Sequence, residues 1–233
     1  MRFYRLWAEG GSGINMIGVI VSSRLEMMCR IVALAIAALV LTACATPQEG
    51  VRRYLAQNGI VDPNPSDFKI CYSHGCIKSA QVQLSSAQWE HIRTVFVPRP
   101  SDAAVERACI ARAIGELESI VGPLTGTDVD IGGSFQGTVR KNQMDCEDEA
   151  INTCTYLAMM NNDGLITYHD IYRPTIRGFV VMGWPHVANV VVDKETKEKF
   201  VVDSWFGDNG HPAYMVPLKK WKLGWRPQHD RQG

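Results

Sequence analysis

The order of apolar and polar positions predicts helices in the first half of the chain and strands in the second. A helix is expected over about residues 86–96, because Ser85 and Gln88 stand three apart as a capping box. A second helix should follow Ser101 as its cap and end at Gly122-Pro123, because this pair interrupts helices. Its apolar residues recur at helical spacing, which indicates one buried face.

A third helix should follow the cap residue Asp145 and end at the sequence Asn161-Asn162-Asp163-Gly164. After it, runs rich in β-branched and aromatic residues, separated by turn signals, predict strands. These runs are Phe179–Met182, His186–Val192 and Phe200–Asp203. Helices followed by an antiparallel sheet indicate one α+β domain, expected over residues 68–233.

The N-terminal part has the pattern of an export signal. Ile31–Leu41 is an unbroken apolar run of eleven residues, too short to span a bilayer but typical of a signal-peptide core. Two small residues and Cys44 follow directly, and this arrangement resembles a bacterial lipobox, whose cysteine is acylated. Residues 1–43 are therefore predicted to be removed, with Met27 or Met28 as the start of translation. An ordinary secretory signal and a short buried helix are the alternatives.

Composition and charge narrow the class of protein. The 233 residues are 46% apolar, enough for one globular domain, and carry 24 basic and 24 acidic side chains. Residues 1–43 contain four arginines and two glutamates, so the mature chain has 20 basic and 22 acidic side chains. Without a basic excess, no nucleic-acid partner is expected. Residues 44–67 are polar and proline-containing, and we expect a lipidated tether there.

The seven cysteines are an informative odd count. Cys29 belongs to the predicted signal, and Cys44 would carry lipid. Five remain in an oxidising compartment, so at least one should be free; they are Cys71, Cys76, Cys109, Cys146 and Cys154.

The Cys71 and Cys76 thiols are expected to form a disulfide. A metal site with His74 is the alternative, but the fourth ligand of a structural zinc site is missing nearby. Cys109 could pair with Cys154. Cys146 and Cys154 would lie about 12 Å apart along a regular helix, too far for a disulfide.

Cys146 is the candidate nucleophile because it begins the third predicted helix. Backbone N–H groups and the helix dipole stabilise a thiolate at such a position and offer donors to an oxyanion. Four neighbouring carboxylates, at positions 145 and 147–149, oppose the thiolate, so an imidazolium beside it would be needed.

His186 opens one predicted strand and Asp203 closes the next. If the hairpin turn is centred between residues 195 and 196, position 203 faces position 188, which lies on the same sheet face as His186. The carboxylate would then orient the imidazole, which would act as the base for Cys146. A register slip of one residue would separate the two side chains.

Three segments together resemble bacterial transglutaminase-like cysteine peptidases. Met144–Ala150 is similar to the nucleophile region, His186–Val192 to the histidine strand, and Val201–Trp205 to the aspartate segment. The order Cys, His, Asp agrees, and the resemblance covers about residues 140–210. It implies a papain-like α+β core, a Cys-His-Asp triad, acyl transfer from a peptide or protein amide through a thioester, and no metal or organic cofactor.

The other site residues are less well defined. The family often has a glycine just before the nucleophile segment, where this chain has Gln143-Met144. Gln143 and Gln136 are oxyanion candidates by residue type only. Trp205 is expected either to wall the cleft or to fill the core. His169 and His211 are expected at the surface or in loops, although His211 could line the site.

Each residue of the predicted triad also has a non-catalytic interpretation. Cys146 could be a structural thiol, His186 a sheet histidine, and Asp203 the end of a strand. The basic and aromatic segment at residues 219–226 could touch anionic lipid, or pack its tryptophans on the domain. The sequence predicts a lipid-anchored envelope enzyme that faces the periplasm from the outer membrane. The alternative is a non-catalytic envelope lipoprotein that binds a peptide, peptidoglycan or protein. Hydrolysis and transamidation share the thioester and are not distinguished.

Overall fold

The computed structural model describes residues 27–32, 46–134, 140–178 and 185–228. The chain divides into two compact units, Met1–Ala45 and Thr46–Gly233. In the first unit, residues 27–32 are helical and exposed, whereas Cys44, the predicted lipidation site, lies outside the described residues. No helix in the described ranges is long and apolar enough to cross a bilayer.

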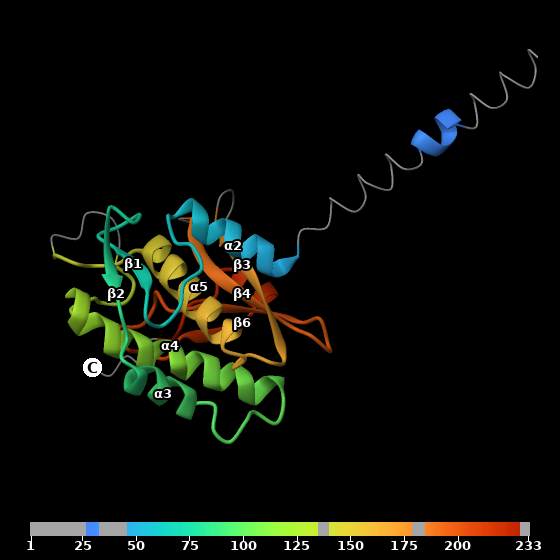
Figure 1. Ribbon diagram of the computed structural model, residues 1–233. Coiled ribbons are helices and arrows are strands. Elements are labelled where there is room, and N and C mark those ends of the chain that lie inside the picture. The colour runs from blue at the N-terminus through green and yellow to red at the C-terminus, as the bar shows by residue number, and fades with distance from the viewer. Residues whose placement is uncertain (1–26, 33–45, 135–139, 179–184, 229–233) are drawn as a thin grey trace, which may run out of the picture. The chain divides into compact units, whose positions relative to one another are not determined.

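The second unit is mixed helix and antiparallel sheet, so the predicted α+β class is confirmed (Figure 1). Its helices are α2 (Pro47–Gln57), α3 (Ser86–Thr94), α4 (Ala103–Thr125), α5 (Cys146–Asn162) and α6 (Leu218–Lys222). Its strands are β1 (Phe68–Tyr72), β2 (Lys78–Val82), β3 (His169–Arg177), β4 (His186–Asp193), β5 (Lys199–Asp203) and β6 (Tyr214–Pro217). Strands β1 and β2 form a hairpin, and β3–β4–β5–β6 form a four-stranded antiparallel sheet.

Local signals set the ends of α3 and α5. Ser85 and Gln88 form the predicted capping box of α3. Asp145 caps α5 as predicted, and Asp148 completes a second capping box there. The first residue of each helix is therefore determined by side chains at its cap and three residues later.

Two expectations for α4 were wrong. Its cap is Asp102, whose carboxylate accepts from the Val105 N–H at 2.9 Å, while Ser101 donates to Asp102. The helix also continues through Pro123 to Thr125 and ends at Gly126, which has a φ of +74°. A proline in the last turn removes one hydrogen bond without breaking the few that remain, so the left-handed glycine ends the helix instead.

The predicted tether over residues 44–67 was also wrong for its described part. Residues 47–57 form α2, with Thr46 as cap and Pro47 in the first turn. Val51, Leu55 and Ile60 are buried in the core. Proline is well tolerated at a helix start. The polar residues belong to the exposed face of a packed helix rather than to a linker.

The four-stranded sheet buries both of its faces. Val191 and Val202 belong to the main core with α4 and α5. Ala188, Val190 and Val201 form a smaller core on the other face, closed by Trp221 of α6. In Figure 1, α5 lies between the sheet and α4. His186 and Asp203 alternate with the main-core residues and therefore face the smaller core.

The register of β4 and β5 agrees with the predicted turn centre. Asn189 pairs with Val202 and Val192 with Lys199, so Asp203 stands opposite position 188. The strands β3 and β6 and the helix α6 were not predicted. The expected strand at Phe179–Met182 lies outside the described residues.

Candidate active site

Cys146 is the first residue of α5 and is partly buried. The Asp145 carboxylate accepts from the N–H groups of Glu147 and Asp148, at 3.1 and 3.0 Å. Burial, together with the charges of Asp145, Asp203 and Glu147, raises the pKa of the Cys146 thiol to about 11. A hydrogen bond from the Val187 N–H opposes this rise. The resting cysteine is therefore a neutral thiol at neutral pH, held at the start of β4.

His186 and Asp203 form a buried pair. Nε2 of His186 lies 2.7 Å from Oδ2 of Asp203, and the residues are 5% and 1% exposed. An ionised carboxylate only accepts hydrogen bonds, so Nε2 carries the proton and Nδ1 is left as an acceptor. Nδ1 is buried without a hydrogen-bond partner. The imidazole thus has an unbonded ring nitrogen one residue from Val187, the residue whose N–H lowers the pKa of the Cys146 thiol.

Trp221 is a site residue that the sequence did not reveal. Its indole Nε1 donates to Oδ2 of Asp203 at 2.7 Å, and the residue is fully buried. Asp203 therefore receives two N–H groups on one oxygen. The aromatic residues within 219–226 are evident in the sequence, but no local signal links Trp221 to an aspartate eighteen residues earlier.

Three aromatic rings surround the imidazole of His186. The ring centroids of Trp205, Phe206 and Trp221 lie 4.7, 5.2 and 5.4 Å from that of His186. Trp205 is buried and donates from Nε1 to the Ser134 carbonyl at 2.9 Å. Trp205 is therefore a buried residue, as the core role predicts, and it also contacts the histidine.

Arg177 binds the segment of Trp221 and Trp225 next to this site. It pairs with His186 across the β3–β4 ladder. Its Nη1 donates to the carbonyls of Trp221 and Trp225, at 2.6 and 2.8 Å, and its guanidinium carbon lies 4.4 Å from the Trp221 ring centroid. The cation satisfies two carbonyls at the end of α6, where a positive charge is favoured.

The segment before Cys146 is bound to a loop at residues 127–134. Asp130 accepts from the Met144 N–H at 2.6 Å, and Ser134 donates to the Met144 carbonyl at 2.7 Å. The Gln143 side chain accepts from the Ile131 N–H and donates to the Val129 carbonyl. Gln143 thus binds this loop with both ends of its amide and is not directed to an oxyanion. Gln136, the other oxyanion candidate, lies outside the described residues.

The same loop contacts the aspartate segment. The Gly133 N–H donates to the Trp205 carbonyl at 2.6 Å, and the Gly132 N–H donates to Asp208 at 2.9 Å. A Cβ on Gly132 would lie 2.5 Å from the Phe206 carbonyl oxygen. Only glycine allows the two backbones to approach this closely. The loop therefore joins the segments that carry Cys146 and Asp203.

The predicted disulfide between Cys71 and Cys76 is confirmed. Its loop rests on the start of α5, because Asp148 accepts from the N–H groups of His74 and Cys76, at 2.7 and 2.6 Å. Residues 73–76 all have positive φ. The carboxylate of Asp148 thus satisfies backbone donors in a loop whose conformation is unfavourable for side-chain-bearing residues.

Several carboxyl groups are buried around the start of α5. Burial raises the pKa of Asp130 to about 7 and that of Asp148 to about 6. Burial also raises the pKa of Glu149 and of Glu118. Glu149 accepts from Ser204 at 2.5 Å, which links α5 to the residue after Asp203.

The other cysteines and histidines have no hydrogen bond to Cys146, His186 or Asp203 among the described residues. Cys109 is partly exposed and Cys154 fully buried, and neither is in a disulfide. The prediction for His169 was wrong, because it is fully buried and its Nδ1 lies 2.8 Å from Glu106. His211 is exposed and stacks on Tyr214. In the part of the chain that the structure describes, no His, Cys, Asp and Glu side chains are grouped to hold a metal.

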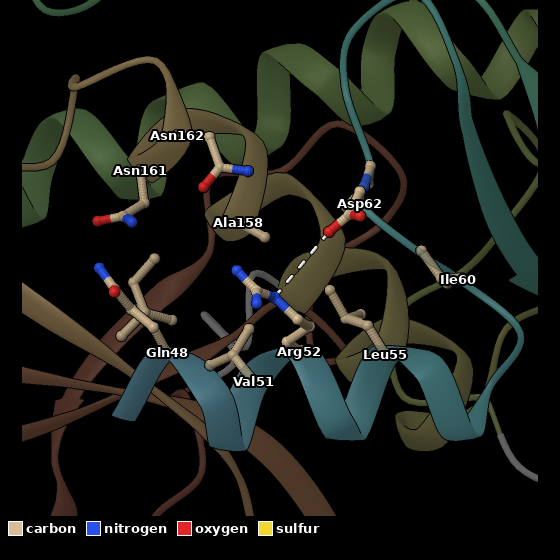
Figure 2. A pocket seen from close by; sticks show the side chains of 11 residues that line it. Gln48, Val51, Arg52, Leu55, Ile60, Asp62, Ala158, Asn161 and Asn162 are labelled. Carbon is tan, nitrogen blue, oxygen red and sulfur yellow. Dashed lines mark ion pairs between the residues drawn. The ribbon is translucent and has the colours of Figure 1, made fainter. Parts of the chain in front are cut away.

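A cavity of about 120 Å³ lies at the other end of α5 (Figure 2). Figure 2 shows it between α2, the end of α5 and the segment with Ile60 and Asp62, where Arg52 and Asp62 form an ion pair at 3.9 Å. Asn161 at its edge is about 22 Å along the helix axis from Cys146. The cavity is therefore separate from the residues around the nucleophile.

Comparisons with models of protein families, with curated proteins and with solved structures found no match for this chain.

Proposed function

We propose that this domain has a papain-like core of the transglutaminase-like type and transfers acyl groups from peptide or protein amides through Cys146. The observation that carries the proposal is the His186–Asp203 pair at 2.7 Å, whose Nδ1 is buried and unbonded one residue before Val187, the residue whose N–H lowers the pKa of the Cys146 thiol. Nucleophile, base and orienting carboxylate are the three parts that such chemistry requires.

In the proposed reaction, Nδ1 of His186 takes the proton of the Cys146 thiol as the sulfur attacks the amide carbonyl. In this proposal the N–H of Cys146, in the first turn of α5, donates to the developing oxyanion, because the first N–H groups of a helix have no partner within it. The amine then leaves with the proton from His186, and a thioester forms. Water releases a carboxylic acid in a hydrolase, and a primary amine releases a new amide in a transamidase.

The raised pKa of Cys146 shapes this mechanism. A thiol with a pKa of about 11 contains little thiolate at neutral pH, so attack depends on proton transfer to His186 rather than on a preformed ion. Asp203 favours this transfer because it stabilises the imidazolium that results. The Val187 N–H stabilises negative charge on the sulfur during the step.

The test is the rate at which iodoacetamide alkylates Cys146 in the mature protein, followed by mass spectrometry of the peptide that contains it. Cys146 should react faster than a free model cysteine, and His186→Ala and Asp203→Asn should each slow it at least tenfold. His91→Ala is the matched control, because His91 is an exposed histidine that binds Glu116 on the helical side of the domain. It should leave the rate unchanged.

The second candidate is a non-catalytic envelope lipoprotein that binds a peptide, peptidoglycan or protein. The raised thiol pKa favours it, because a structural cysteine needs no activation. Under this alternative, Cys146 would react no faster than the model cysteine and would be insensitive to His186→Ala. Incorporation of a fluorescent primary amine into a glutamine-containing peptide would separate transamidation from hydrolysis.

We also propose that Cys44 is lipidated and anchors the protein to the outer membrane, facing the periplasm. The supporting observation is the apolar run followed directly by small residues and cysteine. Cys44→Ser should move the protein from the membrane to the soluble fraction, whereas unchanged fractionation would refute the anchor.

A further inference from the structure

The outer surface of α6 and of the segment after it carries concentrated positive charge, and we name it the basic face. Residues 217–226 contain four basic side chains and no acidic one, whereas the mature chain as a whole has 20 basic and 22 acidic side chains. All four cations are exposed, and Leu223 among them is 75% exposed. The basic face comprises Lys219, Lys220, Lys222, Leu223 and Arg226.

Contacts beneath α6 hold these side chains toward solvent. Trp221, on the opposite side of the short helix, is fully buried and donates to Asp203 at 2.7 Å. Nζ of Lys222 donates to Oγ1 of Thr175 on β3 at 2.9 Å. Arg177, also on β3, donates to the Trp221 carbonyl at 2.6 Å. The helix is therefore attached to β3 and β5 from within, and its cations stand at fixed places on the surface.

The positive charges of this region have no carboxylate partners at the surface. Among the described residues, none of the cations of the basic face makes a salt bridge. Burial lowers the pKa of Arg177, and the charge of Arg226 adds to this, while the buried Asp203 opposes it. Burial and the charge of Arg177 lower the pKa of Lys222. These cations repel one another, so an external anion would stabilise them.

An open hollow extends the basic face to the turn between β4 and β5. It has a volume of about 650 Å³ and is lined by residues 196–199 and 217–219. Its charged side chains are those of Lys197, Lys199 and Lys219 and one carboxylate, Glu198. Nζ of Lys197 donates to the Lys194 carbonyl at 2.6 Å, whereas the ammonium groups of Lys199 and Lys219 have no hydrogen-bond partner among the described residues. The hollow therefore adds cations that are free to bind an anion.

Apolar side chains lie among these cations. Leu223 is 75% exposed and Ile176 is 49% exposed. The Ile176 carbonyl accepts a hydrogen bond from the Lys222 ammonium, so this apolar residue borders the basic face. A soluble anion gains nothing from exposed apolar side chains. A bilayer interface accommodates both kinds of residue, because cations lie beside its headgroups and apolar side chains enter the acyl boundary.

We propose that the basic face binds the anionic phospholipid headgroups of a bilayer, with Leu223 and Ile176 entering the interface. The proposal is independent of acyl transfer and of lipid on Cys44, because it concerns the surface of the folded domain alone. A tether leaves a domain free to rotate, whereas a second contact determines which face meets the membrane. Binding through α6 would place the helix that contacts Asp203 next to the membrane surface.

Co-sedimentation with lipid vesicles tests the proposal. The protein consists of residues 44–233 with Cys44→Ser, which lacks the predicted signal and any lipid but retains the whole second compact unit. The vesicles contain phosphatidylcholine alone or phosphatidylcholine mixed with phosphatidylglycerol. The partition coefficient should be at least about tenfold larger for the mixed vesicles at low salt, and this preference should fall as salt is added.

Lys219→Gln combined with Lys220→Gln removes two exposed charges from the basic face. Each cation near an anionic membrane strengthens binding about fivefold, so this variant should partition about 25-fold less into the mixed vesicles. Lys78→Gln combined with Lys141→Gln is the matched control, because these exposed lysines lie in β2 and before α5. It changes the net charge equally and should reduce partitioning by about twofold or less.

Leu223→Ser tests the apolar part of the interface and should reduce partitioning by about fivefold. Val61→Ser is its control, because Val61 is 72% exposed and lies between α2 and β1. All of these variants should unfold at the same urea concentration as the parent protein, since the replaced side chains are exposed.

Two results would overturn the proposal outright: equal partitioning into both kinds of vesicle, or equal losses in the two double-lysine variants. Binding to soluble poly-glutamate as tight as binding to the mixed vesicles, and unaffected by Leu223→Ser, would assign the basic face to an acidic protein partner instead of a bilayer.

Discussion

Trp221 and Asp203 are joined by a hydrogen bond from the indole Nε1 to Oδ2, at 2.7 Å. The same oxygen lies 2.7 Å from Nε2 of His186. Because one buried oxygen accepts both groups, the indole limits rotation of the carboxylate and thereby fixes the imidazole. The short helix α6 thus contributes to the candidate site from a part of the chain that follows every residue of the proposed triad.

Replacing Trp221 by phenylalanine tests this relationship. Trp221→Phe keeps an aromatic ring but removes the donor, and we expect the free energy of unfolding to fall by about 1–3 kcal/mol. The alkylation rate of Cys146 should fall as well, because Asp203 loses the bond that orients it. Urea denaturation and the iodoacetamide assay measure the two effects.

Trp89→Phe is a closely matched control for that variant. Trp89 donates from its own indole to Asp163 at 3.0 Å, away from Cys146. Its loss should lower stability by a similar amount and leave the alkylation rate of Cys146 unchanged. If both variants slowed alkylation equally, Trp221 would act through general stability rather than through Asp203.

Local sequence signals were sufficient for several elements of the fold and for part of the site. The capping residues Ser85 and Asp145 predicted the starts of α3 and α5 because the hydrogen bonds involved span only three residues. The hairpin turn after β4 predicted the register that brings Asp203 beside His186. Both relations depend on short-range geometry, which the sequence pattern expresses directly.

The pattern of apolar and polar residues does not predict contacts between residues far apart in the sequence. His169 is buried because Glu106 on α4 accepts its ring N–H, and the two are 63 residues apart. Arg177 and Trp221 join the site through contacts across 44 residues. Most residues of α2 are polar, so the sequence did not indicate that Val51 and Leu55 form a buried face of this helix. Each case depends on a tertiary partner that no local propensity specifies.

Gly132→Ala should destabilise the loop that joins the two segments of the site. The added Cβ would lie 2.5 Å from the Phe206 carbonyl oxygen and 2.6 Å from the Gly207 carbonyl carbon, so one backbone must move. Overpacking of this kind typically costs about 1–3 kcal/mol, measured here by urea denaturation.

Gly50→Ala is the control for the loop variant. Gly50 lies in α2, and a Cβ there would meet nothing within 4 Å. Alanine should raise stability by about 0.5–1 kcal/mol, because glycine is the poorer helix former. A Gly132→Ala protein as stable as the wild type would show that the loop adjusts without cost.

Stability should decrease as the pH rises from 5.5 to 8. Burial raises the pKa of Asp130 to about 7 and of Asp148 to about 6, so the folded state binds more protons than the unfolded state in this range. By linkage, the free energy of unfolding then falls with rising pH. Carboxyls with lowered pKa values, such as Asp163, give the opposite slope only at lower pH, as they become protonated.

Asp130→Asn tests the contribution of one of these two carboxyl groups. Asparagine imitates the protonated carboxyl and still offers an oxygen to the Met144 N–H. Urea denaturation at pH 5.5 and 8 should show a smaller loss of stability in the variant than in the wild type. Equal losses would mean that Asp130 is not the group that titrates.

Removing the disulfide should weaken the loop that rests on α5. Cys71 and Cys76 are five residues apart, and closing so short a loop contributes about 2 kcal/mol by chain entropy. In Cys71→Ser combined with Cys76→Ser, residues 73–76 lose the link that holds them at positive φ, and Asp148 loses the two N–H groups that satisfy it. We therefore expect a loss of about 2 kcal/mol or more in urea denaturation. Wild-type protein under reducing conditions should show the same loss, and a double variant as stable as the oxidised wild type would refute the role assigned to the loop.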